Sequence, residues 1–192
     1  ATDAENSELS FSAESDNQLV IVSLLSNQLT MTPVANFNGT ANITVIVNDG
    51  FFTDSETFEL IVIPVNDAPI LDEIGSQVTA EDITLQIILS AVDVDEDLLI
   101  FQAFSFGSNI SAEIHGDTLL LVPELNWHGE VDIMVTVSDG QAGDSEMWSL
   151  TVTPVNDAPV LSDQEDQTTL EDEPLTITLS ADDVDNAVLT YS

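Results

Sequence analysis

Apolar and polar residues alternate along much of the chain with a period of two. Residues 131–137 read V-D-I-M-V-T-V, and residues 43–47 read I-T-V-I-V. Strict alternation is typical of a β-strand with one buried face, and the β-branched Val, Ile and Thr of these runs suit a pleated surface. The runs end at turn-forming pairs such as Asn38-Gly39 and Asp139-Gly140. The pattern therefore predicts an all-β chain of short strands joined by tight turns.

The pattern also repeats. The string P-V-N-D-A-P occurs at residues 64–69 and again at 154–159, and 154 − 64 gives a period of 90. The same offset relates the D-V-D triplet at 93–95 to that at 183–185, without insertion or deletion. Self-similarity at a fixed offset indicates tandem domains. We therefore expect a partial repeat at 1–66, a complete repeat at 67–156 and a second partial repeat at 157–192.

Turn signals divide the complete repeat into seven predicted strands. Seven short strands in a domain of about 100 residues are typical of an immunoglobulin-like sandwich with Greek-key connections. The expected fold class is therefore all-β, with tandem immunoglobulin-like seven-stranded Greek-key β-sandwich repeats. The predicted strands are 76–79, 83–90, 97–104, 110–114, 118–122, 130–137 and 146–153.

The amino-acid composition excludes several classes of function. The chain has 192 residues, of which 43% are hydrophobic, so a disordered acidic tail is excluded. It holds 36 Asp and Glu and no Lys or Arg. A chain without cationic side chains has no means of binding phosphate backbones by charge, so nucleic acid and anionic membrane surfaces are excluded as partners. No apolar run is long enough to insert into a membrane, and the absence of cysteine excludes disulfides.

The acidic residues cluster at a fixed register of the repeat. Residues 93–97 read D-V-D-E-D, residues 182–185 read D-D-V-D, and residues 3–5 read D-A-E at the equivalent place. Both side chains of an Asp-x-Asp turn can converge on one hard cation, and Ca²⁺ prefers such oxygen ligands. A solvated acidic loop is the alternative for any one cluster. Recurrence beside the Asn-Asp linker and the Asp-Gly turn favours a metal site.

These residues together resemble a known family. The V-N-D-A-P linker, the Glu-Asp before the second strand, the D-x-D after it and the late D-G turn are similar to cadherin-type repeats. The similarity is greater still to the bacterial cadherin-like tandem repeats of large secreted adhesins, and it covers the whole chain. The resemblance implies Ca²⁺ at the junctions between consecutive repeats, with ligands from the linker and from both neighbouring repeats.

The resemblance also implies two sets of metal ligands. At the first junction they are Asn66, Asp67, Asp93, Asp95 and Asp139. At the second junction they are Glu81, Asn156, Asp157, Asp183 and Asp185. Further junctions, which this sequence does not complete, would use Asp3, Glu5, Asp49 and Glu171.

The sequence departs from the family pattern in ways that lower the expected number of ions. The linker lacks the second Asn of the longer cadherin form, and the acidic L-D-R-E segment is replaced by residues 33–39 and 123–129. We therefore expect one or two ions per junction, with dissociation constants of about 10⁻⁴ to 10⁻³ M, as in other extracellular modules. Asp93 is the most strongly expected ligand.

The function expected from these features is a structural or adhesion repeat of an extracellular surface or biofilm protein. Its partners would be calcium ions and neighbouring repeats of the same protein. An enzyme is not expected, because a catalytic carboxylate pair would be duplicated in every repeat and no insertion forms a pocket.

The simplest account of the two partial repeats is a window from a longer array, in which neighbouring repeats of the same chain complete them. Two alternatives stay open. In the first alternative, residues 157–192 of one chain complete residues 1–66 of another copy in a head-to-tail filament. In the second, the repeats bind surface glycans or a protein.

Overall fold

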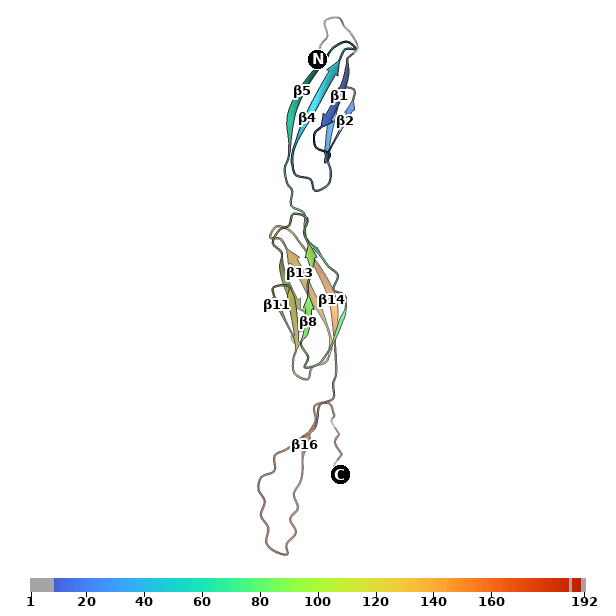
Figure 1. The fold of residues 1–192 in the computed structure, drawn as a ribbon. Helices are drawn as coiled ribbons and strands as arrows, with labels where there is room; N and C mark the ends of the chain where they lie inside the picture. The colour runs from blue at the N-terminus through green and yellow to red at the C-terminus, as the bar shows by residue number, and fades with distance from the viewer. Residues whose placement is uncertain (1–8, 187, 191–192) are drawn as a thin grey trace. The chain divides into compact units, whose positions relative to one another are not determined.

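The computed structural model describes residues 9–186 and 188–190, and every regular element within them is a β-strand (Figure 1). The chain divides into two compact units, Ala1–Asp67 and Ala68–Ser192. We call the first the N-terminal unit, strands β6 to β14 of the second the central sandwich, residues 154–157 the second linker, and residues 158–186 the C-terminal segment. The described residues contain no helix that could cross a membrane.

The N-terminal unit contributes five of the described strands, and the second unit contributes the rest. The first five are β1 (Ser10–Ser15), β2 (Val20–Leu25), β3 (Gln28–Pro33), β4 (Gly39–Asn48) and β5 (Thr53–Val62). The central sandwich holds β6 (Ile70–Leu71), β7 (Gln77–Ala80), β8 (Leu85–Ile88), β9 (Ala91–Val92), β10 (Ile100–Ser105), β11 (Ile110–His115), β12 (Thr118–Pro123), β13 (Gly129–Ser138) and β14 (Gly143–Thr153). The C-terminal segment holds β15 (Val160–Leu161) and β16 (Ala181–Asp182).

All seven strands predicted in the complete repeat are present, with the largest shifts at the starts of β14 and β10 and smaller ones elsewhere, and the short strands β6 and β9 were not predicted. β14 begins at Gly143 rather than at residue 146, and β10 begins at Ile100 rather than at residue 97. The later start of β10 has a local cause. Asp93 Oδ1 accepts hydrogen bonds from the N–H groups of Asp95 and Asp97, at 2.8 and 3.4 Å, and these bonds hold the preceding residues in a turn.

Two sheets face each other in the central sandwich. One has the order β10-β13-β14-β7, the other has the order β11-β12-β8, and β6 pairs with β9. The β14–β7 pair is parallel, running from Leu150 opposite Gln77 to Thr153 opposite Ala80, and the other ladders are antiparallel. The predicted immunoglobulin-like sandwich is therefore confirmed.

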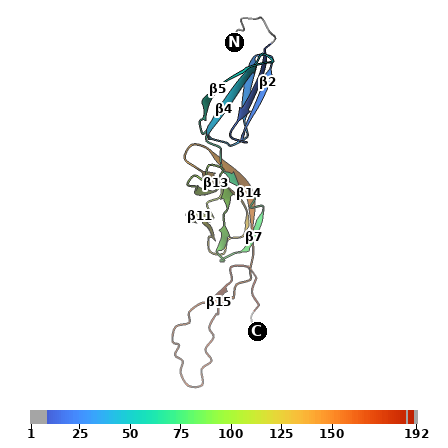
Figure 2. The same cartoon turned by 45° about the horizontal axis from the view of Figure 1, so that its top comes forward.

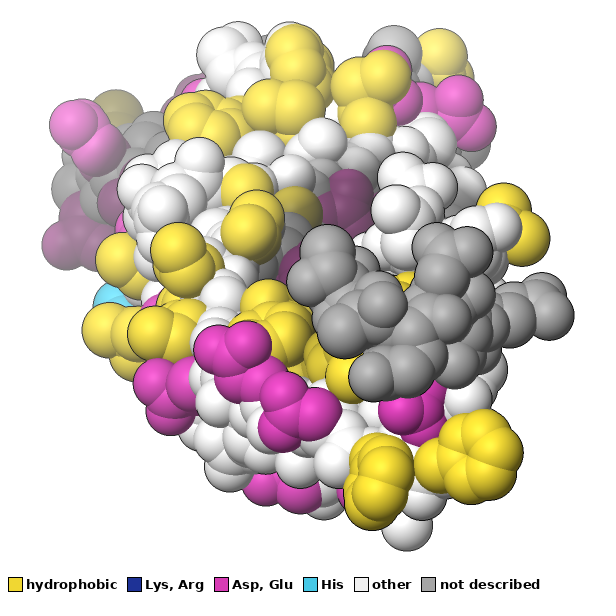
Figure 3. Space-filling view, turned by 90° about the horizontal axis from the view of Figure 1, so that it is seen from above, with side chains coloured by type: hydrophobic (Ala, Val, Ile, Leu, Met, Phe, Trp, Pro, Cys, Tyr) yellow, Lys and Arg dark blue, Asp and Glu magenta, His cyan; other side chains and the backbone are white. Residues whose placement is uncertain are grey.

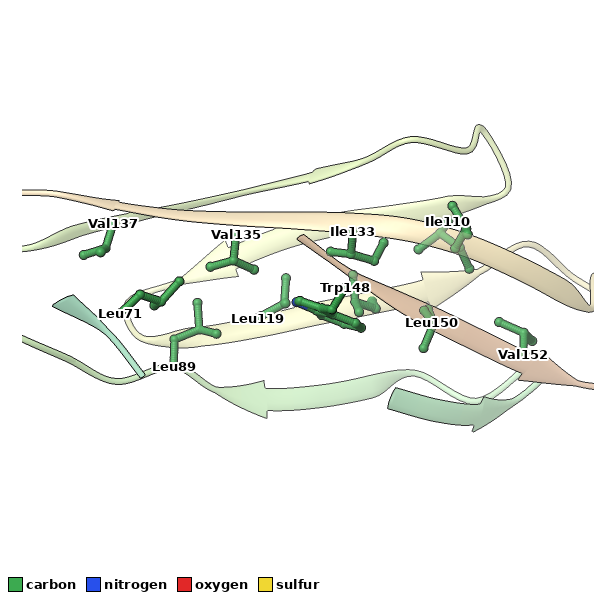
Figure 4. Packing of buried hydrophobic residues seen from close by; sticks show 12 residues of the cluster. Leu71, Leu89, Ile110, Leu119, Ile133, Val135, Val137, Trp148, Leu150 and Val152 are labelled. Carbon is green, nitrogen blue, oxygen red and sulfur yellow. The ribbon is translucent and has the colours of Figure 1, made fainter. Parts of the chain in front are cut away.

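Alternating residues of both sheets form the core between them (Figure 4). Along β13, Ile133, Val135 and Val137 are buried, as the period of two predicts. Burial of each such side chain contributes about 1.5–3 kcal/mol to folding. Trp148 of β14 lies in this core, and Trp127 packs against it beside the turn at Gly129. The core therefore accounts for both tryptophans.

The N-terminal unit has the same hairpins but fewer strands. Its sheets have the orders β1-β4-β5 and β2-β3. Ile43 lies opposite Phe58 in the β4–β5 ladder, and Ile133 lies opposite Trp148 in the β13–β14 ladder, so the register is conserved at the offset of 90. Its buried hydrophobic residues among those described are Val20, Ala41 and Ile43.

The C-terminal segment is an open loop closed by one short ladder (Figure 2). Val160 pairs with Asp182 and Leu161 with Ala181, and residues 162–180 between them form no strand. All residues from Glu171 to Ser180 are exposed.

Candidate metal sites

The carboxylate of Glu81 lies against the backbone of the linker that follows β14. Glu81 is only 3% exposed. Its Oε1 accepts a hydrogen bond from the N–H of Val155 at 2.6 Å, and its Oε2 lies 3.6 Å from Nδ1 of His128. The N–H of Glu81 donates to the carbonyl of Thr153 at 2.9 Å. Glu81 is therefore fixed beside the linker from which two predicted ligands come.

Asp157 is the centre of this site. Its N–H donates to Oδ2 of Asp185 at 2.5 Å, while its own Oδ2 is buried without a hydrogen-bond partner. Loss of solvation raises the pKa of Asp157 most, and the nearby negative charges of Asp185, Asp82, Glu81 and Asp183 raise the pKa further, in that order. Carboxylates from before and after the linker therefore lie near enough to this half-buried Asp to repel its charge.

The Asn side chain has the same hydrogen bond in both linkers, which are 90 residues apart. Asn156 Nδ2 donates to the carbonyl of Asp157 at 2.7 Å, and Asn66 Nδ2 donates to that of Asp67 at 2.8 Å. Asn156 Oδ1 accepts from Asn186 Nδ2 at 3.5 Å. The side-chain oxygen of Asn156 is therefore directed toward the D-x-D turn of the C-terminal segment.

The leading Asp of each D-x-D triplet holds the turn that follows it, with one hydrogen bond in common and a second that differs. Asp183 Oδ1 accepts from the N–H groups of Asp185 and Asn186 at 2.9 and 2.8 Å, as Asp93 Oδ1 does from the backbone that follows it. One oxygen of the leading Asp thus shapes the turn. The other, Asp93 Oδ2, is buried and has no hydrogen-bond partner.

Asp97 joins the first D-x-D turn, although the family pattern does not include it. One carboxylate oxygen from each of Asp93, Asp95 and Asp97 lies within 4.8 Å of the other two. Among the described residues this is the only group of three acidic, His or Cys ligands that lies so close together. The signal was present in the D-V-D-E-D run, but position 187 holds Ala, so Asp97 does not recur and the repeat gave no reason to select it.

Asp139 stabilises the turn that the Asp139-Gly140 pair predicts. Its Oδ1 accepts hydrogen bonds from the N–H groups of Gln141 and Ala142, both at 2.6 Å. Asp49 Oδ1 does the same for Phe51 and Phe52, at 2.7 and 2.6 Å. One oxygen of each Asp therefore holds the turn between the two long strands of its hairpin.

The ten predicted ligands divide into two groups, according to whether they belong to one compact unit or to two. Glu81, Asn156, Asp157, Asp183 and Asp185 lie in one unit, and the contacts above place them around the second linker. Asn66 and Asp67 end the N-terminal unit, whereas Asp93, Asp95 and Asp139 belong to the second unit, so their association stays a prediction. Of the further residues, Glu171 is exposed, and Asp3 and Glu5 lie outside the described residues.

The fold and the acidic turns define an immunoglobulin-like sandwich repeat, and a family model matches part of the chain. Residues 65–153 match the family model described as a cadherin-like domain, so the predicted resemblance to cadherin-like repeats is confirmed for this segment. No curated protein matches the sequence.

One solved structure supports the fold, and a second is similar at a lower score. Human protocadherin-24 EC1-2 is 14% identical, with 79% of this chain and 84% of that chain covered and a TM-score of 0.50. An endo-fucoidan hydrolase from glycoside hydrolase family 107 is 18% identical over 79% of this chain and 24% of that chain, with a TM-score of 0.39. The chain thus spans about a quarter of that hydrolase. At these identities the protocadherin likeness shows the fold alone, and the lower-scoring hydrolase likeness supports no inference about activity.

Proposed function

We propose that the chain is a non-enzymatic structural or adhesion repeat of an extracellular surface protein, and that calcium stiffens it at the boundaries between repeats. The observation that supports this most is Asp157. A half-buried carboxylate with an unpartnered oxygen, surrounded by four other carboxylates, is an unfavourable arrangement in a chain without Lys or Arg. A bound cation would turn the same arrangement into a favourable one.

The proposed mechanism is electrostatic. Two carboxylates about 4 Å apart repel by about 4 kcal/mol at an effective dielectric of about 20. Glu81 belongs to the central sandwich, Asn156 and Asp157 to the linker, and Asp183 and Asp185 to the C-terminal segment. Calcium, when bound, would supply the positive charge that these ligands lack. Because it would bind only the converged arrangement, it would shift the equilibrium from a flexible linker toward a rigid one.

The first boundary is proposed to work in the same way, with Asn66, Asp67, Asp93, Asp95 and Asp139. Asp97 is added to this set because its carboxylate lies beside those of Asp93 and Asp95. We expect one or two ions at each boundary, with dissociation constants of about 10⁻⁴ to 10⁻³ M. An extracellular location is part of the proposal, since cytosolic calcium would not fill sites of this affinity.

Calorimetric titration of the whole chain with CaCl₂ tests the proposal. Binding heat and a higher melting temperature are expected, and Asp157→Asn should remove the ion at the second boundary while leaving the first. Asp95→Asn should do the reverse. Asp166→Asn, an exposed carboxylate of the C-terminal segment, is the matched control for loss of one charge. No heat from the unaltered chain, together with no change in melting temperature on chelation, would overturn the calcium mechanism.

A second candidate function, glycan binding, is favoured by one observation. Phe51 and Phe52 in the β4–β5 turn are 88% and 80% exposed, and the equivalent residues of the central sandwich are Gln141 and Ala142. Exposed aromatic rings on a turn fixed by Asp49 offer an apolar face for a sugar ring. Retention of a labelled glycan by the chain, lost in the Phe51→Ala/Phe52→Ala double variant, would support this function. No retention on a broad glycan array would exclude it.

A further inference from the structure

Four apolar side chains lie together on the outer face of the β10-β13-β14-β7 sheet of the central sandwich. Phe104 of β10 lies opposite Met134 of β13, and Met134 lies opposite Met147 of β14. Phe106 follows two residues later on the same side, and its N–H donates to the carbonyl of Asp132 at 3.0 Å. Phe104, Phe106 and Met147 are 48%, 64% and 64% exposed, and Met134 between them is half-buried. We call these four residues the outer patch.

The fold of the repeat does not require apolar residues at these positions. At the offset of 90, the N-terminal unit has Glu14, Asp16, Thr44 and Thr57 in their places. The hydroxyls of Thr44 and Thr57 share a hydrogen bond at 2.9 Å across β4 and β5, the equivalents of β13 and β14. Asp16 Oδ1 and Oδ2 accept hydrogen bonds from the N–H and Nδ2 of Asn42, both at 2.8 Å. Equivalent strands therefore pair with polar side chains on this face, and the outer patch has a cause other than folding.

Carboxylates border the outer patch on one side only. Asp132 and Glu130 are exposed and occupy the next two outward positions of β13, two and four residues before Met134. At about 3.4 Å per residue, they lie about 7 and 14 Å from Met134 along the strand. The row on the other side of the patch is uncharged and consists of Gln102, Thr136 and Ser145. A contiguous apolar patch with a polar border is typical of an interaction site.

The charge of the chain indicates the chemistry of the partner. The chain has no Lys or Arg, and Figure 3 shows hydrophobic side chains among Asp and Glu on one face of the molecule. A second copy would bring another formal net charge of −36 toward Asp132 and Glu130, so repulsion opposes self-association. Cationic groups beside apolar ones would instead complement this surface. The flexible, polarisable side chains of Met134 and Met147 suit contact with apolar groups of varied shape.

We infer that the outer patch binds an amphipathic segment of another protein that carries Lys or Arg beside apolar residues. The apolar side chains of the partner lie on the outer patch, and its cationic groups lie toward Asp132 and Glu130. Because the acidic border is on one side, it also fixes the direction in which the segment lies. The inference adds a partner to the proposed adhesion role and does not depend on the calcium sites.

NMR of the whole chain labelled with ¹³C at the methionine methyl groups tests the inference. The chain has three methionines, and Met31 of the N-terminal unit is an internal control for Met134 and Met147. The probe is the capped peptide Leu-Ser-Leu-Ser-Lys-Ser-Lys, whose Leu and Lys side chains lie about 7 Å apart along one face when it is extended. Its addition should shift the signals of Met134 and Met147 until they saturate and leave that of Met31 unchanged.

Two matched peptides separate the apolar and the charged parts of the contact. Replacement of both Leu by Ser, or of both Lys by Glu, should weaken binding by about tenfold or more. Equal binding of either peptide would overturn the inference, as would the absence of shifts at millimolar probe. Shifts of Met134 and Met147 that depend on chain concentration without peptide would assign the patch to a second copy and also overturn it. With calcium chelated throughout, a negative result would leave the calcium mechanism standing.

A pair of uncharged variants tests the patch itself. Phe104→Ser/Met147→Thr removes two exposed apolar side chains and should weaken binding of the probe, read from Met134, by about tenfold. Ile88→Ser/Val122→Thr is the matched control, because these residues are 77% and 40% exposed on the outer face of the other sheet. It should bind the probe as the unaltered chain does. Equal weakening by both variants would remove the outer patch from the contact.

A second pair of variants tests the acidic border. Glu130→Gln/Asp132→Asn should weaken binding of the probe and make it less sensitive to NaCl, since salt screens the attraction that these carboxylates provide. Asp163→Asn/Asp166→Asn removes the same charge from exposed positions of the C-terminal segment and should leave binding unchanged. Equal effects of the two variants would show attraction to the acidic chain as a whole and would overturn the inference.

Discussion

The N-terminal unit and the central sandwich have equivalent hairpins in the same register, but they bury the apolar side chains of those hairpins to different extents. Ile43 and Ile133, which are equivalent, are both fully buried. Leu60 and Leu150 are also equivalent, yet Leu150 is fully buried and Leu60 is only half-buried. The β4–β5 and β13–β14 ladders pair equivalent residues throughout. Alternation and turn residues therefore set the hairpins, whereas completeness of the core depends on strands that come from elsewhere in the repeat.

The largest expected effect is a difference in the free energy of unfolding between equivalent substitutions in the central sandwich and the N-terminal unit. Leu150→Ala should lower the free energy of unfolding of the central sandwich by about 2–5 kcal/mol, because it leaves a cavity among fully buried side chains. Leu60→Ala should cost about 1 kcal/mol, since water already reaches part of that side chain. Chemical denaturation of each variant measures both.

The matched control is Leu150→Met, which keeps the volume and should cost less than about 1.5 kcal/mol. Equal losses for Leu60→Ala and Leu150→Ala at low protein concentration would contradict the open core of the N-terminal unit.

The second prediction compares two equivalent glutamates. Glu81 is buried and accepts the N–H of Val155, whereas Glu171 is exposed. Glu81→Leu removes the acceptor of a backbone donor at the linker and should cost about 1–3 kcal/mol. Glu171→Leu should change the free energy of unfolding by less than about 0.5 kcal/mol. Thermal unfolding with calcium chelated measures the difference, and a neutral Glu81→Leu would show that the linker contact contributes nothing.

The strands could be predicted because their signal is local. Residues 131–137 alternate in the sequence, and β13 buries them in the same alternation. The D-x-D turns are local too, since Asp93 and Asp183 accept hydrogen bonds from residues that follow within the same turn. The early start of β14 was missed because residues 143–145 are Gly, Asp and Ser, which favour turns when considered alone.

The features that the sequence did not predict depend on contacts between distant residues. The unpartnered oxygen of Asp157 results from burial, and its link to Asp185 spans 28 residues. The contribution of Asp82 to the pKa of Asp157 likewise depends on the linker passing beside the central sandwich. Alternation and spacing in the sequence show which residues recur, but they do not show which of those residues are desolvated in the folded chain. The identity of the ligands was therefore inferred from resemblance, and the electrostatic cost of bringing them together came from the structure.

The smallest expected effect contrasts two carboxyl groups whose pKa values shift in opposite directions. The N–H groups of Leu71 and Ser145 lower the pKa of Asp144, whereas desolvation and neighbouring carboxylates raise that of Asp157. A lowered pKa stabilises the fold above the ordinary value of 3.8, and this stabilisation is lost as pH falls through the lowered pKa. A raised pKa has the opposite effect. The contribution of that group to the stability of the fold is fully present below 3.8 and is lost as pH rises through the raised pKa.

NMR titration of the whole chain with calcium chelated separates the two. As pH rises from 3.8, the backbone signals of Asp157 and Asp185 should report loosening of their contact, while those of Asp144 and Leu71 should not. Asp157→Asn should abolish the loosening, because the amide keeps the shape without the charge. Added calcium should also abolish it in the unaltered chain, since the cation would offset the repulsion that ionised Asp157 creates. Loosening that persists in Asp157→Asn would assign the pH dependence to another carboxylate and remove Asp157 from the centre of the site.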